Sequence, residues 1–392
     1  MHSNYFSGKV SKDLTYLYIS RTITFFSNGF FSLFLPIFLY TTLGYNAQQT
    51  LLFYLIGSIL CFVIYPLSAK HIEKFNLKNA LYVATIANIL FLLTLSITTN
   101  DNIQSTILFA LFFLTVFRLF YWLPYHTTFT RFSDQNNRMR EVTAFQATLH
   151  IVGIVSPLIA GVIIAQSSYQ VLFIVGICIY ALSLIPLLSM SDVYETYSWG
   201  YRETWQKLFS KEYRHAMTAH FADGVESSVG MVIWPIFIFT LLDGNFVAIG
   251  AISAITIAIT VILELTVGKY ADNMENKAKV LKINSFFYAF GWIVKIFIVT
   301  GFQIFLADAY HKITQALSKN SLAAITYDIS ADEGHFVDEF TVIKSMAIHI
   351  GRSVLFLASI IIVHYVSIEW TFVLAAIGAL LVNTIRLQKK VS

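Results

Sequence analysis

The chain has 392 residues, of which 57% are hydrophobic and only 12% are charged, and its mean hydropathy is +0.67. A water-soluble domain carries more charge and less apolar surface, so this composition excludes an ordinary soluble globular protein. The net charge of +4 is small and the basic residues are dispersed among short connections, which argues against nucleic acid as a partner.

The apolar residues fall in successive runs of about 20 residues, the length of a helix that crosses roughly 30 Å of hydrocarbon. In chain order the predicted spans are residues 16–42, 50–69, 80–98, 103–129, 142–165, 168–189, 215–242, 246–267, 280–300, 302–326, 340–364 and 368–386. Kinks are expected at five prolines inside these runs, Pro36, Pro124, Pro157, Pro186 and Pro235. The sequence therefore predicts an all-α polytopic membrane protein with twelve transmembrane helices.

Lysine and arginine are absent from the connections after the odd-numbered spans and gather in the connections on the other side. The positive-inside rule then predicts a multi-pass protein of the cell membrane with both termini in the cytoplasm. The longest connection, residues 191–214, is polar and aromatic and divides the spans six and six. We predict an N-terminal half over 1–190, a cytoplasmic linker over 191–214 with an amphipathic helix at the interface, and a C-terminal half over 215–392.

An internal repeat relates these halves. Shifting the chain by 199 residues places Pro36-Ile37-Phe38 on Pro235-Ile236-Phe237 and residues 69–78 on residues 268–277. Because six spans per half preserve orientation, the repeat is parallel, about a pseudo-twofold axis along the membrane normal.

Short motifs occur after the second and eighth spans and within the fifth span. Gly268-x-x-x-Asp272 with Lys277 follows the eighth span, a degenerate copy with Ala69, Glu73, Lys74 and Lys78 follows the second, and the fifth contains Ser156-Pro157-Leu158-Ile159-Ala160-Gly161. With Arg118 in the fourth span, the chain resembles the major facilitator superfamily, in motif pattern nearest to its drug/proton antiporters. Ala69, Glu73 and Ser156 depart from the motif residues Gly, Asp and Gly. The resemblance implies transport by alternating access.

The loop motif is predicted to act in gating through Ala69, Glu73, Lys74, Lys78, Gly268, Asp272 and Lys277. Its carboxylate is suited to cap the following helix, or to bind a cation across the domain interface and hold one face closed. The alternative is that these residues only set topology and cap a helix.

Ionisable residues inside the spans are informative because each costs several kcal/mol unless it is paired or hydrated. They recur three or four residues apart in four spans, and hence on one helix face in each. The resemblance implies that these four spans line a central cavity. The predicted substrate and proton cavity residues are Arg21, Asn28, Arg118, Trp122, Tyr125, His220, Asp223, Glu226, Asp308, Lys312 and Gln315.

His220, Asp223 and Glu226 are the predicted proton-coupling residues. A carboxylate in a cavity of low dielectric changes its proton affinity when Arg118 or Lys312 approaches, and an entering solute can switch that balance. The alternative is a set of fixed ion pairs, of which Asp308 with Lys312 at i,i+4 would be one.

Pro157, Gly161, Glu264, His349 and Arg352 are predicted at the interface between the halves, in a gating network or a static one. The acidic residues Asp328, Asp332, Glu333, Asp338 and Glu339 are expected to form a solvated face.

No phosphate-binding loop, dinucleotide fingerprint, nucleophile motif or paired-histidine metal motif occurs, so we predict no enzyme, cofactor or metal. The predicted function is secondary transport of a small organic solute coupled to protons, as efflux antiport, by a monomer whose partners are the bilayer, the solute and protons. Two alternatives remain. One is uptake of an anionic or zwitterionic solute, favoured by Arg21, Arg118, Lys312 and Lys319, and the other is a non-transporting receptor or assembly subunit.

Overall fold

A computed structural model describes residues 11–132, 138–271, 277–332 and 337–385. Every regular element in these ranges is a helix, which confirms the all-α prediction. The first set is α1 (Lys12–Phe31), α2 (Leu35–Thr42), α3 (Ala47–Lys74), α4 (Leu77–Ser96), α5 (Ile103–Phe132), α6 (Arg138–Gln166), α7 (Tyr169–Leu182) and α8 (Leu184–Leu188). The second set follows α9 (Tyr201–Leu208) and comprises α10 (Arg214–Ser228), α11 (Trp234–Leu241), α12 (Phe246–Ala271), α13 (Lys277–Lys295), α14 (Gly301–Asp332), α15 (Val337–Tyr365) and α16 (Phe372–Leu381).

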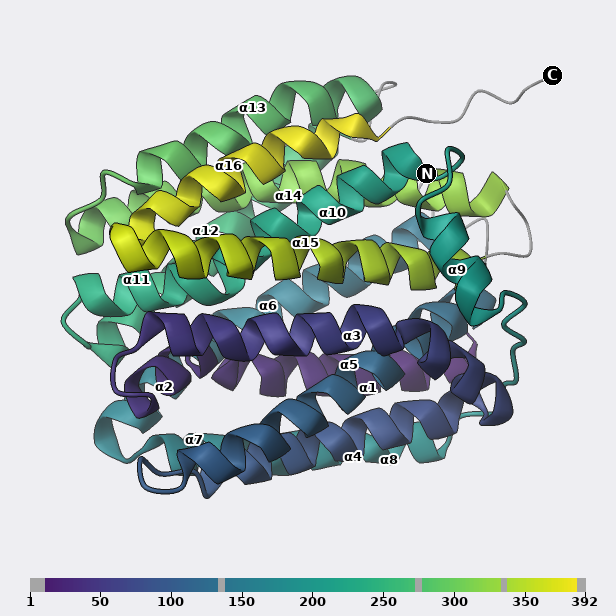
Figure 1. The fold of residues 1–392 in the computed structure, drawn as a ribbon, viewed down its shortest axis with the longest axis horizontal. Coiled ribbons are helices and arrows are strands. Elements are labelled where there is room, and N and C mark those ends of the chain that lie inside the picture. The colour runs from purple at the N-terminus through teal and green to yellow at the C-terminus, as the bar shows by residue number, and fades with distance from the viewer. Residues whose placement is uncertain (1–10, 133–137, 272–276, 333–336, 386–392) are drawn as a thin grey trace, which may run out of the picture.

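The helices run side by side along the long axis of the molecule, with α3, α4 and α5 in the lower part of Figure 1 and α13, α15 and α16 in the upper part. Each predicted span coincides with one helix or with two consecutive helices. Seven segments of the described chain are long and apolar enough to cross a membrane, and three shorter helices are also apolar. The chain is therefore a multi-pass membrane protein, and the number of twelve crossings stays a prediction.

The outside of the bundle is apolar. Leu108, Phe109 and Phe112 on α5 are 66%, 61% and 60% exposed, and Phe286 and Phe290 on α13 are 60% and 59% exposed. Side chains of this size on a water-exposed surface would form a patch far larger than soluble proteins tolerate. They suit contact with lipid.

Breaks in the helices recur at the predicted offset of 199 residues. The rod formed by α1 and α2 is interrupted just before Pro36, and the rod formed by α10 and α11 contains a π-helical turn, Val229–Ile233, just before Pro235. Proline lacks an amide hydrogen and is tolerated at the first positions of a helix, so each rod resumes there.

The turns after these rods also match. Gly44 and Tyr45 have φ values of 70° and 61°, and Asp243 and Gly244, at the same offset, have 49° and 75°. Left-handed backbone is rare outside glycine, asparagine and aspartate, so a coincidence of two such pairs indicates related turns.

The helix after each turn is capped in the same way. The Asn46 side chain accepts a hydrogen bond from the Gln49 amide at 2.9 Å, and the Asn245 side chain accepts one from the Ala248 amide at 3.0 Å. These contacts give the repeat a structural basis at the start of α3 and of α12.

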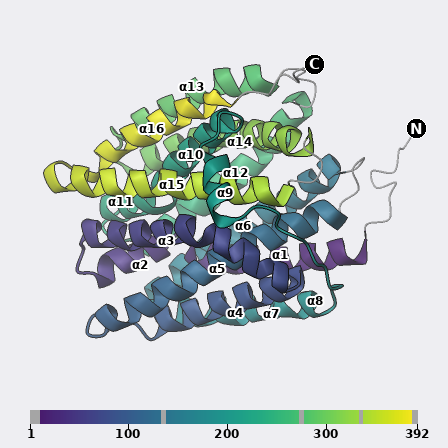
Figure 2. The ribbon, with the colours of Figure 1, turned by 45° about the vertical axis from the view of Figure 1, so that its right-hand side comes forward.

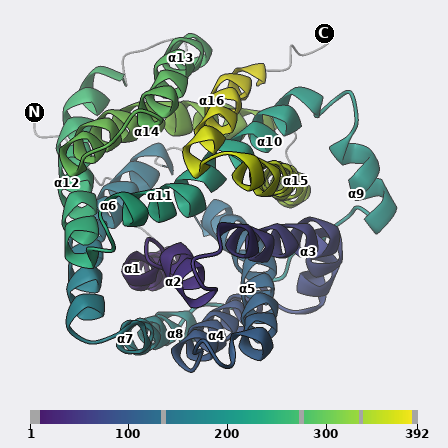
Figure 3. The ribbon, with the colours of Figure 1, turned by 60° about the vertical axis from the view of Figure 1, so that its left-hand side comes forward.

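The two sets of helices meet along two seams, α3 against α15 and α6 against α12, and both pairs adjoin in the end-on view of Figure 3. On the second seam a Cβ atom at Gly161 would lie 2.3 Å from the Phe246 carbonyl oxygen, and one at Gly250 would lie 2.4 Å from that of Pro157. Only glycine permits this approach of the two backbones.

The linker ties the two sets together at one end of the bundle, which we name the linker end. The Leu77 amide donates to the Val193 carbonyl at 2.8 Å, and the Ser198 amide donates to Glu339 Oε1 of α15 at 2.8 Å. The helix α9 packs against α3 and α15 (Figures 1 and 2).

Glu339 is only 1% exposed, and Asp338 accepts a hydrogen bond from Thr127 of α5 at 2.6 Å. The expectation of a solvated acidic face is therefore wrong for these two residues, because the Glu339 carboxylate binds the linker and the Asp338 carboxylate binds α5. Asp328 and Asp332 are described only in their backbone, and Glu333 lies outside the described residues.

Candidate functional site

Glu226 is the centre of a buried polar network. It lies near the middle of the α10–α11 rod and is 1% exposed. The Tyr288 hydroxyl donates to its Oε1, the Trp292 indole donates to the same oxygen at 3.3 Å, and Lys319 Nζ lies 3.1 Å from Oε2. A carboxylate at this depth is thus held by donors from α13 and α14 together.

Lys319 is shared between two carboxylates. Its ammonium group also binds Asp223, one turn before Glu226 on α10. His220, one turn earlier again, is 4% exposed and its Nε2 lies 3.4 Å from the Thr326 hydroxyl of α14. The predicted proton-coupling residues therefore all contact α14.

The network continues through α14. Gln315 Nε2 donates to the Tyr288 hydroxyl at 3.0 Å, and Lys312 Nζ donates to Gln315 Oε1 at 3.4 Å. The His311 ring lies 4.8 Å from that of Tyr288 and 4.4 Å from that of Trp292, and its Nε2 is 3.9 Å from Glu226 Oε1. Gln315 and Lys312 thus form the outer part of the network.

Asp308 pairs with a lysine of a neighbouring helix. It binds Lys295 of α13 at 3.0 Å, with 9% of the aspartate side chain and 1% of the lysine side chain exposed. The Lys295 ammonium also lies 3.8 Å from the ring centroid of Trp234. The i,i+4 pair of Asp308 with Lys312, which was the alternative to a cavity role, does not form among the described residues, because α13 presents a closer cation.

Arg21 lies among aromatic rings of α5. Its guanidinium carbon is 5.0 Å from the ring centroid of Trp122 and 5.3 Å from that of Tyr125, and Nη1 donates to the Tyr121 hydroxyl at 3.2 Å. Such rings stabilise a cation through their negative faces. Asn28 lies two turns further along α1 and is partly buried.

Arg118 is separate from these rings. Its Nη1 reaches α3, where it lies 3.5 Å from the position that a Cβ atom would take at Gly57. Trp122 and Tyr125, expected on the same face, turn toward Arg21 because α1 packs against that side of α5.

The first copy of the gating motif lies at the linker end. Ala69 is buried, Lys74 is exposed, and Glu73 pairs with Lys70 within α3 at 3.2 Å. Asn76, not Glu73, caps the next helix by accepting from the Asn79 amide at 2.6 Å.

Lys78 joins this motif to the linker. Its ammonium group lies 2.8 Å from Asp192 Oδ1 and donates to the Met190 carbonyl at 3.0 Å. Asp272 of the second copy lies outside the described residues, and Glu264, Gly268 and Lys277 are described only in their backbone.

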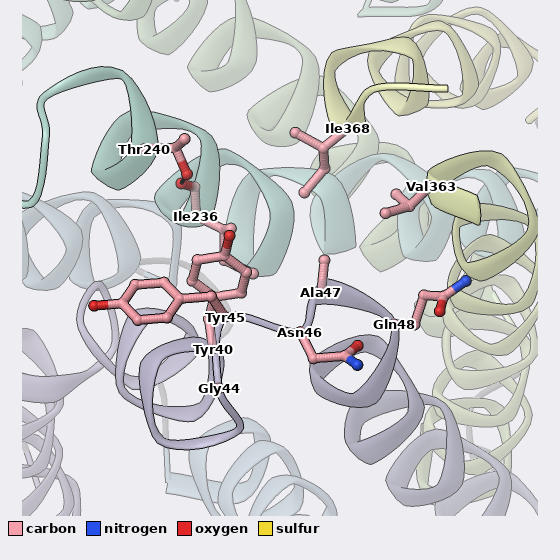
Figure 4. A pocket seen from close by; sticks show the side chains of 10 residues that line it. All are labelled: Tyr40, Gly44, Tyr45, Asn46, Ala47, Gln48, Ile236, Thr240, Val363 and Ile368. Atoms are coloured by element: carbon pink, nitrogen blue, oxygen red, sulfur yellow. Dashed lines mark hydrogen bonds between the residues drawn. The ribbon is translucent and has the colours of Figure 1, made fainter. Parts of the chain in front are cut away.

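A pocket of about 420 Å³ opens at the end of the bundle opposite the linker. Figure 4 shows it between the turn after α2 and the ends of α11 and α15. It is lined by Tyr40, Gly44, Tyr45, Asn46, Ala47, Gln48, Ile236, Thr240, Val363 and Ile368. None of the predicted cavity residues lines it.

Four residues of the network were not predicted: Tyr288, Trp292, Lys295 and His311. The first three recur four and then three residues apart and so share one face of α13, a signal that was available in the sequence. His311 lies between Asp308 and Lys312 in the sequence. The two charged residues gave the stronger signal, so the histidine was not predicted to take part.

Comparison with known proteins indicates a family and a fold. The family profile described as Major Facilitator Superfamily matches residues 17–216. A solved structure described as a POT family transporter in complex with 5-aminolevulinic acid is similar over 94% of each chain, with a TM-score of 0.66 and 12% sequence identity, which shows the fold alone. No curated protein matches the chain.

Proposed function

Because this chain belongs to the major facilitator superfamily, we propose that it is a secondary transporter that moves a small organic solute by alternating access and couples this movement to protons at Glu226. The family and the fold support transport. The proposal of proton coupling rests on the buried network around Glu226. We also propose that the protein lies in the cell membrane with both termini in the cytoplasm.

The observation that carries the proposal is the sharing of Lys319 between Asp223 and Glu226. An ionised Glu226 holds Lys319, Tyr288 and Trp292 and so ties α10 to α13 and α14. A proton on Glu226 cancels its charge, and Lys319 then pairs with Asp223 alone. Protonation thereby changes how firmly three helices are joined, which is the requirement for linking a proton to a conformational change.

The π-helical turn at Val229–Ile233 supports this role, since it begins three residues after Glu226. Such turns replace the regular i→i−4 ladder and often occur at functional sites. The rod that carries Glu226 can therefore bend next to the carboxylate.

The test uses proteoliposomes that enclose a pH-sensitive dye, with organic acids, amino acids and amines added outside in turn. A transported solute should move protons in the unmodified protein and in the Asp101→Asn variant, whose aspartate is exposed in the α4–α5 loop. Glu226→Gln should abolish the proton signal, and Asp223→Asn should reduce it at least about tenfold, because each removes one partner of Lys319. Solute flux without proton movement, or an unchanged signal in Glu226→Gln, would refute the coupling.

A protein that keeps the fold but acts as a receptor would bind a solute in this experiment and show no flux. The direction of proton movement decides between efflux antiport and uptake, since antiport moves the proton and the solute in opposite directions.

A further inference from the structure

Arg118 and Arg352 lie beside the α3–α15 seam, on two helices that both pack against α3. Each lies at the middle of a long helix, Arg118 in α5 and Arg352 in α15. Arg118 Nη1 reaches α3, where it lies 3.5 Å from the position that a Cβ atom would take at Gly57. Cys61, at the middle of α3, interacts with both. One arginine therefore belongs to the first set of helices and the other to the second, at the same depth in the bundle.

His349 completes the cluster. It lies one turn before Arg352, is 5% exposed, and interacts electrostatically with both arginines. Its ring also packs 6.3 Å from that of Tyr65 on α3. These side chains, Arg118, Arg352 and His349, form what we name the seam cluster.

The seam cluster lacks a carboxylate of its own among the described residues. Arg352 interacts with Asp223, but that carboxylate binds Lys319 directly. Within the described chain, Nε of Arg352 and Nδ1 of His349 are buried and accept or donate no hydrogen bond. Arg118 and Arg352 are partly buried. Two like charges inside a membrane protein, one of them with an unused buried donor, are costly, and such groups mark binding sites.

Guanidinium groups present several N–H donors in a fixed plane and bind carboxylate or phosphate oxygens in pairs, with short charge-assisted hydrogen bonds. We propose that the transported solute carries an oxyanion, a carboxylate or a phosphate, which binds between Arg118 and Arg352 across the α3–α15 seam. This inference rests on the proposed transport function and assigns its substrate class.

Binding at this place has a conformational consequence. Without an anion the two arginines repel each other, which favours separation of α5 from α15. An oxyanion between them replaces this repulsion with attraction and draws the seam together, so the occupied state closes around the solute. The solute thus acts on the seam, while the proton acts on the α10–α14 network beside it.

Cys61 gives a direct probe of the seam cluster. The chain has only two cysteines, and Cys178 is exposed, so Cys178→Ser leaves a single thiol that is 0% exposed and interacts with both arginines. In proteoliposomes this protein is treated with two methanethiosulfonate reagents of similar size, one with a sulfonate and one with a trimethylammonium group. The Cys61 sulfur displaces methanesulfinate and forms a mixed disulfide with either reagent.

The ratio of the two rates, divided by the same ratio for a free thiol in solution, reports the charge of the site, because the reactivity of Cys61 itself cancels. We expect the anionic reagent to be preferred about tenfold or more. Arg118→Gln and Arg352→Gln should each bring the ratio toward one, and Arg118→Lys and Arg352→Lys should keep most of it. Arg202→Gln, which makes the same change at an exposed position of α9, should leave it unaltered. Succinate or inorganic phosphate should slow the reaction more than sodium chloride at equal ionic strength, and their order distinguishes carboxylate from phosphate.

A normalised ratio of anionic to cationic rate of one or less in the Cys178→Ser protein would by itself overturn the proposal. A ratio that stays high in both Arg118→Gln and Arg352→Gln would also overturn it. Failure of both reagents to reach Cys61 would also overturn it, since no aqueous path would then lead to the arginines. Equal reaction with both reagents, together with solute flux in the dye assay, would discard the anionic substrate and leave the transport function standing.

Discussion

Lys295 and Asp308 form a deeply buried ion pair, with 1% and 9% of their side chains exposed. Each charge is expensive to bury alone and tolerable only beside its partner. Trp234 and Trp292 add cation–π contacts at 3.8 and 4.7 Å from the lysine. This pair joins α13 to α14 near the end opposite the linker.

Removal of one partner should therefore destabilise the protein strongly. Asp308→Ala is expected to cost about 3–5 kcal/mol, because it leaves the Lys295 charge unpaired. The double change Lys295→Met with Asp308→Leu should cost less than the single change, since no charge remains. Thermal unfolding in detergent measures both. Lys207→Met, at the exposed pair of Lys207 with Glu212, should change stability by less than about 1 kcal/mol.

At the scale of elements, the α6–α12 seam depends on glycine. Gly161 and Gly250 let the two backbones approach until a Cβ atom would lie 2.3 or 2.4 Å from a carbonyl oxygen of the other helix. A backbone carbonyl group within a helix cannot move aside, whereas the end of a flexible side chain can. Any side chain at these positions must push α6 and α12 apart.

Gly161→Ala should therefore lower stability by roughly 1–3 kcal/mol and reduce solute flux, because it separates the seam that must close during each cycle. Gly200→Ala is the matched control, since no atom lies within 4 Å of the position of its Cβ. The melting temperature and the flux in proteoliposomes are measured for both. Equal behaviour of the two variants would show that the α6–α12 approach has no part in folding or transport.

The elements themselves follow from the sequence because a run of about 20 apolar residues has few ways to satisfy its backbone in lipid other than a helix. The directions of side chains between helices do not follow in the same way. A helical period shows that Arg118, Trp122 and Tyr125 are neighbours on α5. It does not show that the two rings contact α1 while the arginine contacts α3. Likewise, the i,i+4 spacing of Asp308 and Lys312 gave no sign that Lys295 lies closer.

At the scale of the whole molecule, two charge centres lie near the middle of the bundle. One joins Glu226, Asp223 and Lys319 within the second set of helices, and the other sets Arg118 against Arg352 across the seam. We propose that the first responds to protons and the second to an anionic solute. Asp223 interacts with both Lys319 and Arg352 and so connects the two centres.

The charge on Glu226 is the central element of this account, and its effect on conformation can be measured directly. Spin labels at Thr99 in the α4–α5 loop and Val299 in the α13–α14 loop, both exposed at the end opposite the linker, report the separation of the two sets of helices. The labelled cysteines are placed in an otherwise cysteine-free protein in proteoliposomes. Pulsed electron paramagnetic resonance should resolve two populations of the distance between the labels, and their ratio should change between alkaline and acidic buffer. Glu226→Gln should hold the acidic ratio at every pH. A single distance that ignores pH, or a Glu226→Gln protein that responds to pH as the parent does, would contradict the account.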